Sequence, residues 1–223
     1  MHNPDDENII FKTAAGFINN SNHPVFLTGK AGTGKTTFLK YIKETCCKNI
    51  AIVAPTGVAA INAGGTTIHS FFQLPFAPFL PVNNQHFGKQ DVIDKHNLIN
   101  KLRLSTERKE VMQQLDLLII DEISMVRCDV LDEIDLVLRH VRKQPGKPFG
   151  GLQVLYIGDM YQLPPVVKDE EWQLLSGCYK NPFFFNSQVI LQQPPVYIEL
   201  KKVYRQSDAG FINLLNQVRN NEM

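Results

Sequence analysis

A glycine-rich segment of eight residues, set between an apolar run and a helical pattern, places the strongest constraint on the fold of this chain. Its sequence, Gly29-Lys30-Ala31-Gly32-Thr33-Gly34-Lys35-Thr36, fits the pattern G-x-x-x-x-G-K-[ST] at every fixed position. The preceding residues 24–28 predict a buried strand, and the following residues 36–42 predict the start of a helix. This order of strand, loop and helix is the context in which the pattern binds phosphate.

Each residue type in this loop has a chemical use. The glycines let the backbone approach phosphate groups, Lys35 can reach the β- and γ-phosphates, and Thr36 can ligate Mg²⁺. A turn without a ligand would need neither the lysine nor the hydroxyl. The sequence therefore predicts a nucleoside triphosphate site that consists of Gly29, Ala31, Gly32, Thr33, Gly34, Lys35, Thr36 and Thr37.

Short apolar runs recur along the chain, with helical patterns between most of them. They cover residues 25–28, 50–54, 117–120, 154–157 and 196–200. Runs that are apolar throughout, rather than alternating, are typical of strands buried on both faces, so we expect an α/β fold with a mainly parallel sheet between helices. Ligands of such sheets bind at the carboxyl ends of the strands. The turns at Gly29, Pro55, Asp121 and Gly158 should therefore meet at one crevice.

The stretch from Gln73 to Gln114 interrupts this alternation. It begins with three prolines, at 75, 78 and 81, and continues as a short, charged, helix-like segment. Because proline removes a backbone donor and disfavours a central strand, we expect an insertion that lies outside the sheet.

Composition excludes several classes of protein. The 23 basic and 22 acidic residues nearly cancel, so any nucleic-acid surface must be local. The four cysteines fit neither a zinc spacing nor a disulfide framework, which favours reduced structural thiols. No apolar run could span a membrane, and the first seven residues are acidic where a signal peptide would be basic. We expect a soluble intracellular protein, from a bacterial cytoplasm or a eukaryotic nucleus.

Two adjacent carboxylates follow the apolar run at 117–120. A nucleotide-hydrolysing site needs one acid near Mg²⁺ and one that orients and deprotonates water, and we assign Asp121 to the metal and Glu122 to the water. By itself, such a pair is often only a strand that runs into a solvated turn. A second turn, after residues 154–157, presents Asp159 and Gln162. Gln162 could sense the γ-phosphate, or the turn could simply be rigid and solvated.

Taken together, these motifs resemble those of the Pif family of superfamily 1 DNA helicases, in order and in spacing. The matching segments are residues 29–36, 54–60, 67–72, 120–125, 158–165 and 203–206. Residues 131–153 are similar to the signature segment that separates this family from its RecD-like relatives, and this match is the most family-specific.

The resemblance implies the first of two RecA-like P-loop domains in an ATP-driven, Mg²⁺-dependent motor. Such a motor moves 5′ to 3′ on single-stranded DNA and opens tailed duplex DNA. The implied catalytic residues are Lys35, Glu122, Gln162 and Arg205, with Thr36 and Asp121 at the metal and Tyr204 on adenine. Arg205 could instead be a surface residue in a basic cluster with Lys201 and Lys202.

The expected DNA contacts are Pro55, Thr56 and His69, since the turn at 55–57 opens a helix and the family uses this region for the strand. We interpret Phe71, Phe72, Trp172 and the run 183–185 as core. Four basic residues, Arg139, Arg142, Lys143 and Lys147, are explained equally by DNA and by a helix with acids near its start and bases near its end.

Two parts of the family pattern are missing. No glutamine precedes the phosphate loop to read adenine, and nothing after Arg205 resembles a second motor domain. We therefore expect motor domain 1A in residues 1–72 and 115–223 and accessory domain 1B in residues 73–114. Such a piece should bind nucleotide with little hydrolysis and no unwinding, because the motor needs both domains.

Two other functions remain open. One is a RecD-like auxiliary motor of a nuclease or recombination complex, which the segment at 131–153 disfavours. The other is a non-catalytic module that binds ATP and single-stranded DNA. The two carboxylates and Arg205 disfavour it, since a module that only binds needs none of them.

Overall fold

The computed structural model describes residues 9–82, 92–201 and 217, and within them a six-stranded sheet organises the chain. The strand order is β3-β2-β6-β7-β1-β8, and every pairing is parallel. The strands are β1 (Val25–Gly29), β2 (Ile50–Ala54), β3 (Thr66–Thr67), β6 (Leu117–Ile120), β7 (Gln153–Gly158) and β8 (Val196–Leu200). The predicted α/β fold with a mainly parallel sheet is confirmed, and the five predicted runs are its five longer strands.

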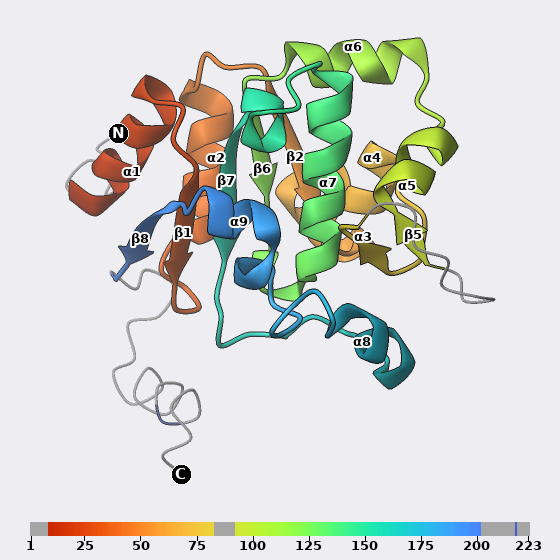
Figure 1. Ribbon diagram of the computed structural model, residues 1–223. Coiled ribbons are helices and arrows are strands. Elements are labelled where there is room, and N and C mark those ends of the chain that lie inside the picture. Colours follow the sequence, from red (N-terminus) through yellow and green to blue (C-terminus); the bar gives the residue numbers. More distant parts are fainter. Residues whose placement is uncertain (1–8, 83–91, 202–216, 218–223) are drawn as a thin grey trace.

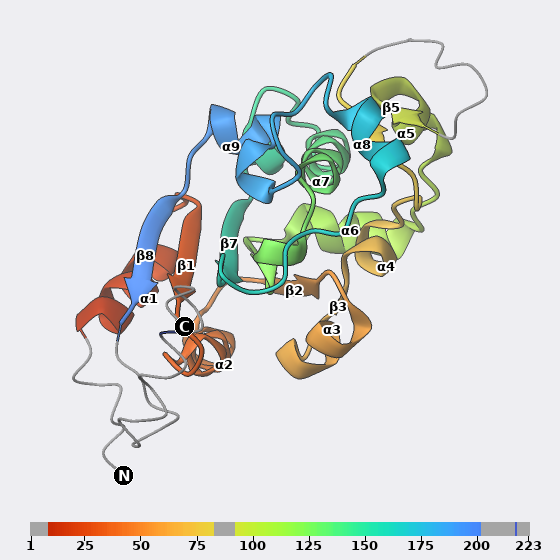
Figure 2. The same cartoon turned by 90° about the horizontal axis from the view of Figure 1, so that it is seen from below.

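Successive strand residues point to opposite faces, and both faces are apolar. In β6, Leu118 and Ile120 belong to one core cluster, and Leu117 and Ile119 belong to the other. The second cluster is covered by α1 (Ile9–Asn20) and α2 (Lys35–Thr45). Figure 2 shows these two helices on one side of the sheet and α7 on the other. Burial on both faces explains why the runs show no alternation.

The other face is covered mainly by α7 (Cys128–Val141) and α9 (Gln188–Gln192), which Figure 1 shows in front of the sheet. The remaining helices are α3 (Gly57–Ala63), α4 (Ile68–Phe72), α5 (Lys95–Lys101), α6 (Thr106–Gln114) and α8 (Asp169–Leu175). Short 3₁₀ helices are η2 (Ile123–Met125), η3 (Pro148–Gly151) and η4 (Phe184–Asn186).

The segment from Gln73 to Gln114 contributes no strand to the six-stranded sheet in its described part. It forms a separate parallel pair, β4 (Phe79–Leu80) and β5 (Ile93–Asp94), followed by α5 and α6. Most of its buried apolar residues, among them Phe79 and Leu98, join the same core cluster as α7, and Leu80 packs with Cys128 at the start of that helix. The segment is therefore packed onto the α7 side of the molecule rather than around a core of its own.

The segment that follows α7 returns closely against it. Gly150 has a φ of +61°, and a Cβ there would lie 2.7 Å from the carbonyl oxygen of Leu138. Arg142 donates from Nε to the Gly150 carbonyl oxygen and from Nη1 to the carbonyl oxygens of Met112 and Leu115. Arg139 pairs with Asp135 at 2.7 Å within α7 and donates from Nη2 to Gln192 Oε1 of α9 at 2.8 Å. Both arginines are thus engaged in holding α7 to its neighbours, whereas Lys143 and Lys147 are exposed.

The aromatic residues predicted as core divide. Phe72 and Phe184 are buried, and Phe71 is half-buried against the same cluster. For Phe185 the prediction was wrong, because 41% of the residue is exposed; its ring stacks on that of Phe183 at 5.4 Å. A run of three aromatics in a 3₁₀ turn cannot bury every ring on one side, since consecutive side chains point in different directions.

Candidate nucleotide and nucleic-acid sites

The phosphate loop joins β1 to α2 at the carboxyl edge of the sheet. Gly29 leaves the strand with a φ of +158°, and a Cβ on it would come within 2.6 Å of the Leu200 carbonyl oxygen in β8. Gly34 precedes α2 with a φ of +94°, in the left-handed region that glycine adopts readily. The first turn of α2 therefore presents its backbone N–H groups to the loop, as an anion site requires.

Lys35 lies within this loop. Its Nζ donates to the carbonyl oxygens of Gly29 at 2.6 Å and Lys30 at 3.2 Å. Burial raises the pKa of both Asp121 and Glu122, and the charge of Lys35 opposes this rise in each, so it acts on both carboxylates. The ammonium group is thus held by the loop and is near enough to the acids that follow β6 for its charge to act on them.

The two acids sit where β6 ends. Burial raises the pKa of Asp121, and the backbone N–H of Glu122 at 3.0 Å opposes this rise. Burial also raises the pKa of Glu122, and the charges of Asp121 and Asp159 raise it further. Glu122 has a φ of +52°, which is uncommon for a residue with a Cβ, and such conformations cluster at functional sites.

The turn after β7 is built around Asp159. The Asp159 side chain accepts from the Tyr161 N–H at 3.1 Å, and its carbonyl oxygen accepts from the Gln162 N–H at 2.9 Å. Gly158 allows this turn to lie against η2, because a Cβ there would meet Ile123 Cγ2 at 2.8 Å. The turn is therefore rigid, and it leaves the Gln162 side chain exposed at the site.

One cavity gathers Lys35, Glu122 and Gln162, whereas Gly29, Thr33 and Asp121 are not among its lining residues. Its volume is about 350 Å³, and its lining residues are Ala31, Gly32, Gly34, Lys35, Thr36, Thr37, Glu122 and Gln162. Residues that are up to 131 positions apart in sequence are brought together here. Tyr204 and Arg205, which the resemblance adds to this site, lie outside the described residues.

A second groove, of about 460 Å³, holds the three residues predicted to contact DNA. Pro55, Thr56 and His69 line one part of it. Thr56 caps α3, because its side-chain oxygen accepts from the Ala59 N–H at 3.2 Å. The expected single crevice is therefore wrong in one respect: the turn at Pro55 opens into this groove, not into the cavity with Lys35 and Glu122.

An aromatic pair marks this groove. The His69 ring stacks on that of Phe76, with centroids 4.6 Å apart and planes within 8° of parallel. Phe76 is 90% exposed, although it is a large apolar side chain. Burial lowers the pKa of His69, and the positive charge of Arg127 lowers it further. The pair thus offers a neutral, flat surface.

Sequence reasoning missed Phe76 and Arg127, which also line the groove. Arg127 lies at the N-cap of α7, where Ser, Thr, Asp or Asn is favoured and a cation is opposed by the helix dipole. A basic residue in that position is a signal that a specific partner holds it. For Phe76, a proline-rich stretch gives no periodicity from which exposure could be predicted.

Across the described ranges 9–82 and 92–201, no helix is long and apolar enough to cross a bilayer. The same ranges contain no group of three or more His, Cys, Asp or Glu side chains placed to hold a metal by themselves.

Comparison with known proteins gives a consistent result. The family model described as PIF1-like helicase matches residues 2–223. The chain is 37% identical over 203 residues to the ATP-dependent DNA helicase PIF1 of Saccharomyces cerevisiae, which covers 88% of the chain and 21% of the relative. The human protein of the same name is 37% identical over 201 residues, with 87% and 27% covered.

Among solved structures, Bacteroides Pif1 bound to single-stranded DNA has a TM-score of 0.84 and 44% identity, over 97% of this chain and 46% of that one. Pif1 from Bacteroides in complex with ADP-AlF3 and single-stranded DNA also has a TM-score of 0.84, at 43% identity, over 97% and 47%. The chain thus spans about a quarter of the length of these curated relatives and just under half of the solved chains.

Proposed function

This chain belongs to the PIF1-like helicase family, and on that premise we propose that it is the ATP-binding motor domain of a DNA helicase that moves 5′ to 3′ on single-stranded DNA. The observation that carries the proposal is the cavity that gathers Lys35, Thr36, Glu122 and Gln162 from three separate turns. A phosphate loop alone supports only nucleotide binding. The added acid and amide supply what hydrolysis requires.

In this proposal, ATP lies with its phosphates along the loop and the start of α2. Lys35 exchanges its contacts with the Gly29 and Lys30 carbonyl oxygens for the β- and γ-phosphates. Gln162 contacts the γ-phosphate from the rigid turn after β7. Arg205 and Tyr204 complete the site in the proposal, at the phosphate and at adenine.

The residues present suit Mg²⁺ as well. Mg²⁺ is usually held by one or two carboxylates together with substrate phosphates rather than by a cage of protein ligands. The carboxylate of Asp121 and the hydroxyl of the exposed Thr36 supply oxygen ligands of the kind that Mg²⁺ prefers. The described ranges contain no group of three or more His, Cys, Asp or Glu side chains that could hold the ion without phosphate. Bound there, the ion would neutralise charge on the transferring phosphate.

Glu122 is the proposed general base. Its pKa is raised by burial and by Asp121, which brings a carboxylate closer to the basicity that proton abstraction from water needs. Glu122 has a left-handed backbone conformation and lines the cavity that Lys35 also lines.

The groove at Pro55, Thr56 and His69 is the proposed path of single-stranded DNA. The N-cap turn of α3 suits a backbone phosphate, and the stacked His69 and Phe76 rings suit a base. Stacking of one base is worth about 1 to 3 kcal/mol without reading sequence. We further propose that residues 73–114 are the accessory unit 1B of motor domain 1A, supported by their separate two-stranded sheet.

The test is ATP hydrolysis with and without single-stranded DNA. The protein assayed is this chain extended with the further sequence that its longer relatives contain. We expect stimulation by DNA that Lys35→Ala and Glu122→Gln each abolish. Lys40→Ala, an exposed position on the same helix α2, serves as the matched control and should leave the rate unchanged. Normal turnover by Glu122→Gln would refute the assignment of the base.

The 223-residue chain is tested separately, by calorimetric titration with ATP and by a strand-displacement assay on a tailed duplex. We expect binding of ATP but no strand displacement. If the extended protein hydrolysed ATP without any response to DNA, both the helicase hypothesis and the hypothesis of a RecD-like auxiliary motor would be wrong.

A further inference from the structure

The groove contains one arginine that the proposed function does not yet use. Arg127 lies across from Thr56 and His69, at the start of α7. Its backbone is fixed by a bridge to Phe183 and by the bond from the neighbouring Cys128 N–H to the Pro182 carbonyl oxygen. Its position in the groove is therefore set by the fold and not by a loose loop.

A buried carboxylate holds the guanidinium in one plane. Asp129 is fully buried and accepts from Arg127 Nε at 2.9 Å and from Nη2 at 2.6 Å. Such a two-point contact fixes the orientation of the side chain as well as its charge. Asp129 also accepts from the Phe79 N–H at 3.1 Å, which anchors the acid itself.

The third contact of Arg127 comes from the groove wall. Glu171, in the first turn of α8, accepts from Arg127 Nη1 at 2.5 Å. Figure 1 shows α8 beside the lower end of α7. A guanidinium has five N–H donors, so these three bonds leave one on each terminal nitrogen without a bond to the described part of the chain.

Glu171 differs in charge from the other residues that line the groove. Among the described residues that line the groove it is the sole carboxylate, beside the cations Arg127 and Lys168. A carboxylate at that position repels a DNA phosphate and covers the cation that would bind one. Unlike Asp129, its side chain is 25% exposed, so it can turn into solvent at low cost. After burial, the charge of Arg127 is the next cause that lowers the pKa of His69, which also lines the groove.

We propose that Arg127 is a phosphate-binding residue of the strand groove, and that Glu171 occupies its guanidinium until single-stranded DNA displaces it. Asp129 keeps the guanidinium oriented in both states, and only the exposed partner is exchanged. The ion pair is then a competing contact that lowers the affinity for DNA. This inference rests on the proposed function, because it requires the strand to lie in this groove.

The test uses the 223-residue chain and a fluorescent oligothymidylate, with the dissociation constant measured by anisotropy at several salt concentrations. Glu171→Gln keeps the size of the side chain and removes its charge, and we expect about two- to fivefold tighter binding at low salt, because solvent still screens part of this partly buried pair. Glu170→Gln makes the same charge change at the neighbouring exposed acid. It should give a smaller gain, because Glu170 does not line the groove.

The double variant Arg127→Gln with Glu171→Gln should lose the gain, with thermal unfolding as the check that it folds. If Glu171→Gln bound DNA no more tightly than Glu170→Gln, the pair would be only a staple between α7 and α8, and the inference would be wrong. If Thr56→Ala and His69→Ala weakened binding in that same experiment, the proposed DNA path would stand. Absence of any binding by the wild-type chain and all variants would overturn both.

Discussion

Glu122 combines a catalytic assignment with a backbone conformation that costs stability. A left-handed conformation costs a residue with a Cβ about 1 to 2 kcal/mol, and glycine avoids this cost. We compare Glu122→Gly with Glu122→Ala, since both substitutions remove the carboxylate. The φ of +52° at this position is strained for alanine but not for glycine. The glycine variant should be more stable by about 1 kcal/mol after its greater entropy in the unfolded chain is counted. Urea unfolding measures the difference, and equal stability would mean that the turn relaxes in both.

Glu133 is a buried carboxyl on α7. Its Oε1 has no hydrogen-bond partner among the residues that the structure describes, and burial together with the charge of Asp129 raises its pKa well above the ordinary value. The folded protein therefore binds this proton more tightly than the unfolded chain does. Stability is greatest below the pKa of an unfolded glutamate and falls as the pH rises toward the folded value.

Glu133→Gln should remove part of this pH dependence. We expect little effect of the substitution at pH values near the unfolded pKa and a gain in stability at alkaline pH, where the glutamate would have to carry a buried charge. Urea unfolding across that range measures it. Glu170→Gln, an exposed acid on α8, is the control and should leave the slope with pH unchanged. An unchanged slope in Glu133→Gln would mean that the carboxyl is not buried as its surroundings indicate.

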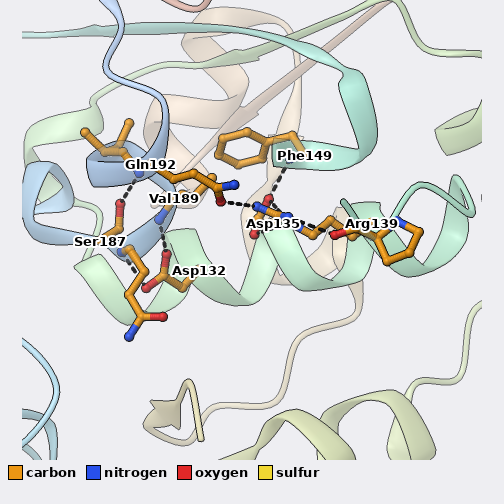
Figure 3. Close-up of polar contacts among 10 residues, drawn as sticks. Asp132, Asp135, Arg139, Phe149, Ser187, Val189 and Gln192 are labelled. Carbon is orange, nitrogen blue, oxygen red and sulfur yellow. Dashed lines mark hydrogen bonds and ion pairs between the residues drawn. The ribbon is translucent and has the colours of Figure 1, made fainter. Parts of the chain in front are cut away.

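At the scale of elements, α7 organises one side of the molecule through acids that face inward. Figure 3 shows Asp132 directed at the start of α9 and Asp135 between Arg139 and Phe149. Asp132 accepts from the Gln188 and Val189 N–H groups, both at 2.9 Å. Tyr179 donates its hydroxyl to the same carboxylate at 2.9 Å. One side chain thus joins α7 to α9 and to the segment after α8.

Asp132→Asn should separate these elements. Burial raises the pKa of Asp132 to about 6, so at pH 7.5 the charged form prevails and accepts all three bonds. The amide of the Asp132→Asn variant would place its own N–H donors against at least one of the three N–H or hydroxyl donors. Losing hydrogen bonds to a charged group lowers the free energy of unfolding by about 2 to 3 kcal/mol. Asp169→Asn, on the exposed first turn of α8, should change stability by less than about 0.5 kcal/mol. Both are measured by urea unfolding at pH 7.5, and similar losses in the two would contradict this role.

The longer elements could be predicted because their patterns extend over several residues, whereas the inward acids of α7 could not. Residues 117–120 are apolar on both faces, which indicates a central strand directly. The sequence of α7 instead places Asp129, Asp132 and Glu133 among apolar residues, where a carboxylate is normally expected to face water. The burial of Asp129 and Asp132 depends on donors from β4, α9 and residue 179, which are distant in sequence. The strands β3, β4 and β5 have two residues each and are too short for any periodicity.

At the scale of the whole molecule, the phosphate loop could be located from sequence, but the separation of its cavity from the strand groove could not. The sequence motifs follow the carboxyl ends of strands, and the parallel sheet brings those ends to one edge. Which turn opens into which cavity depends on loops such as residues 159–162 and 73–78, whose paths are set by tertiary packing. The structure separates Thr56 and Arg127 from Lys35 and Glu122, so nucleotide and strand occupy distinct cavities in the proposed function.

Nucleotide binding to the phosphate loop can be measured through its effect on the stability of the chain. A ligand that binds only the folded state at about 100 times its dissociation constant adds about 2.7 kcal/mol to the free energy of unfolding. We expect a non-hydrolysable ATP analogue with Mg²⁺ to stabilise the 223-residue chain by this order, and EDTA to remove most of the gain. Thr36→Ala should reduce the response to Mg²⁺, because its hydroxyl is a proposed ligand.

Thr45→Ala is the matched control for that experiment. It makes the same substitution at the other end of α2, where the hydroxyl donates to the Tyr41 carbonyl oxygen at 2.7 Å and cannot reach the loop. It should keep the full response to Mg²⁺ with the analogue. If EDTA left the stabilisation intact in the wild-type chain, the nucleotide would be held by the loop and Lys35 without a metal. The assignment of Asp121 and Thr36 to Mg²⁺ would then be wrong, while the phosphate site would remain.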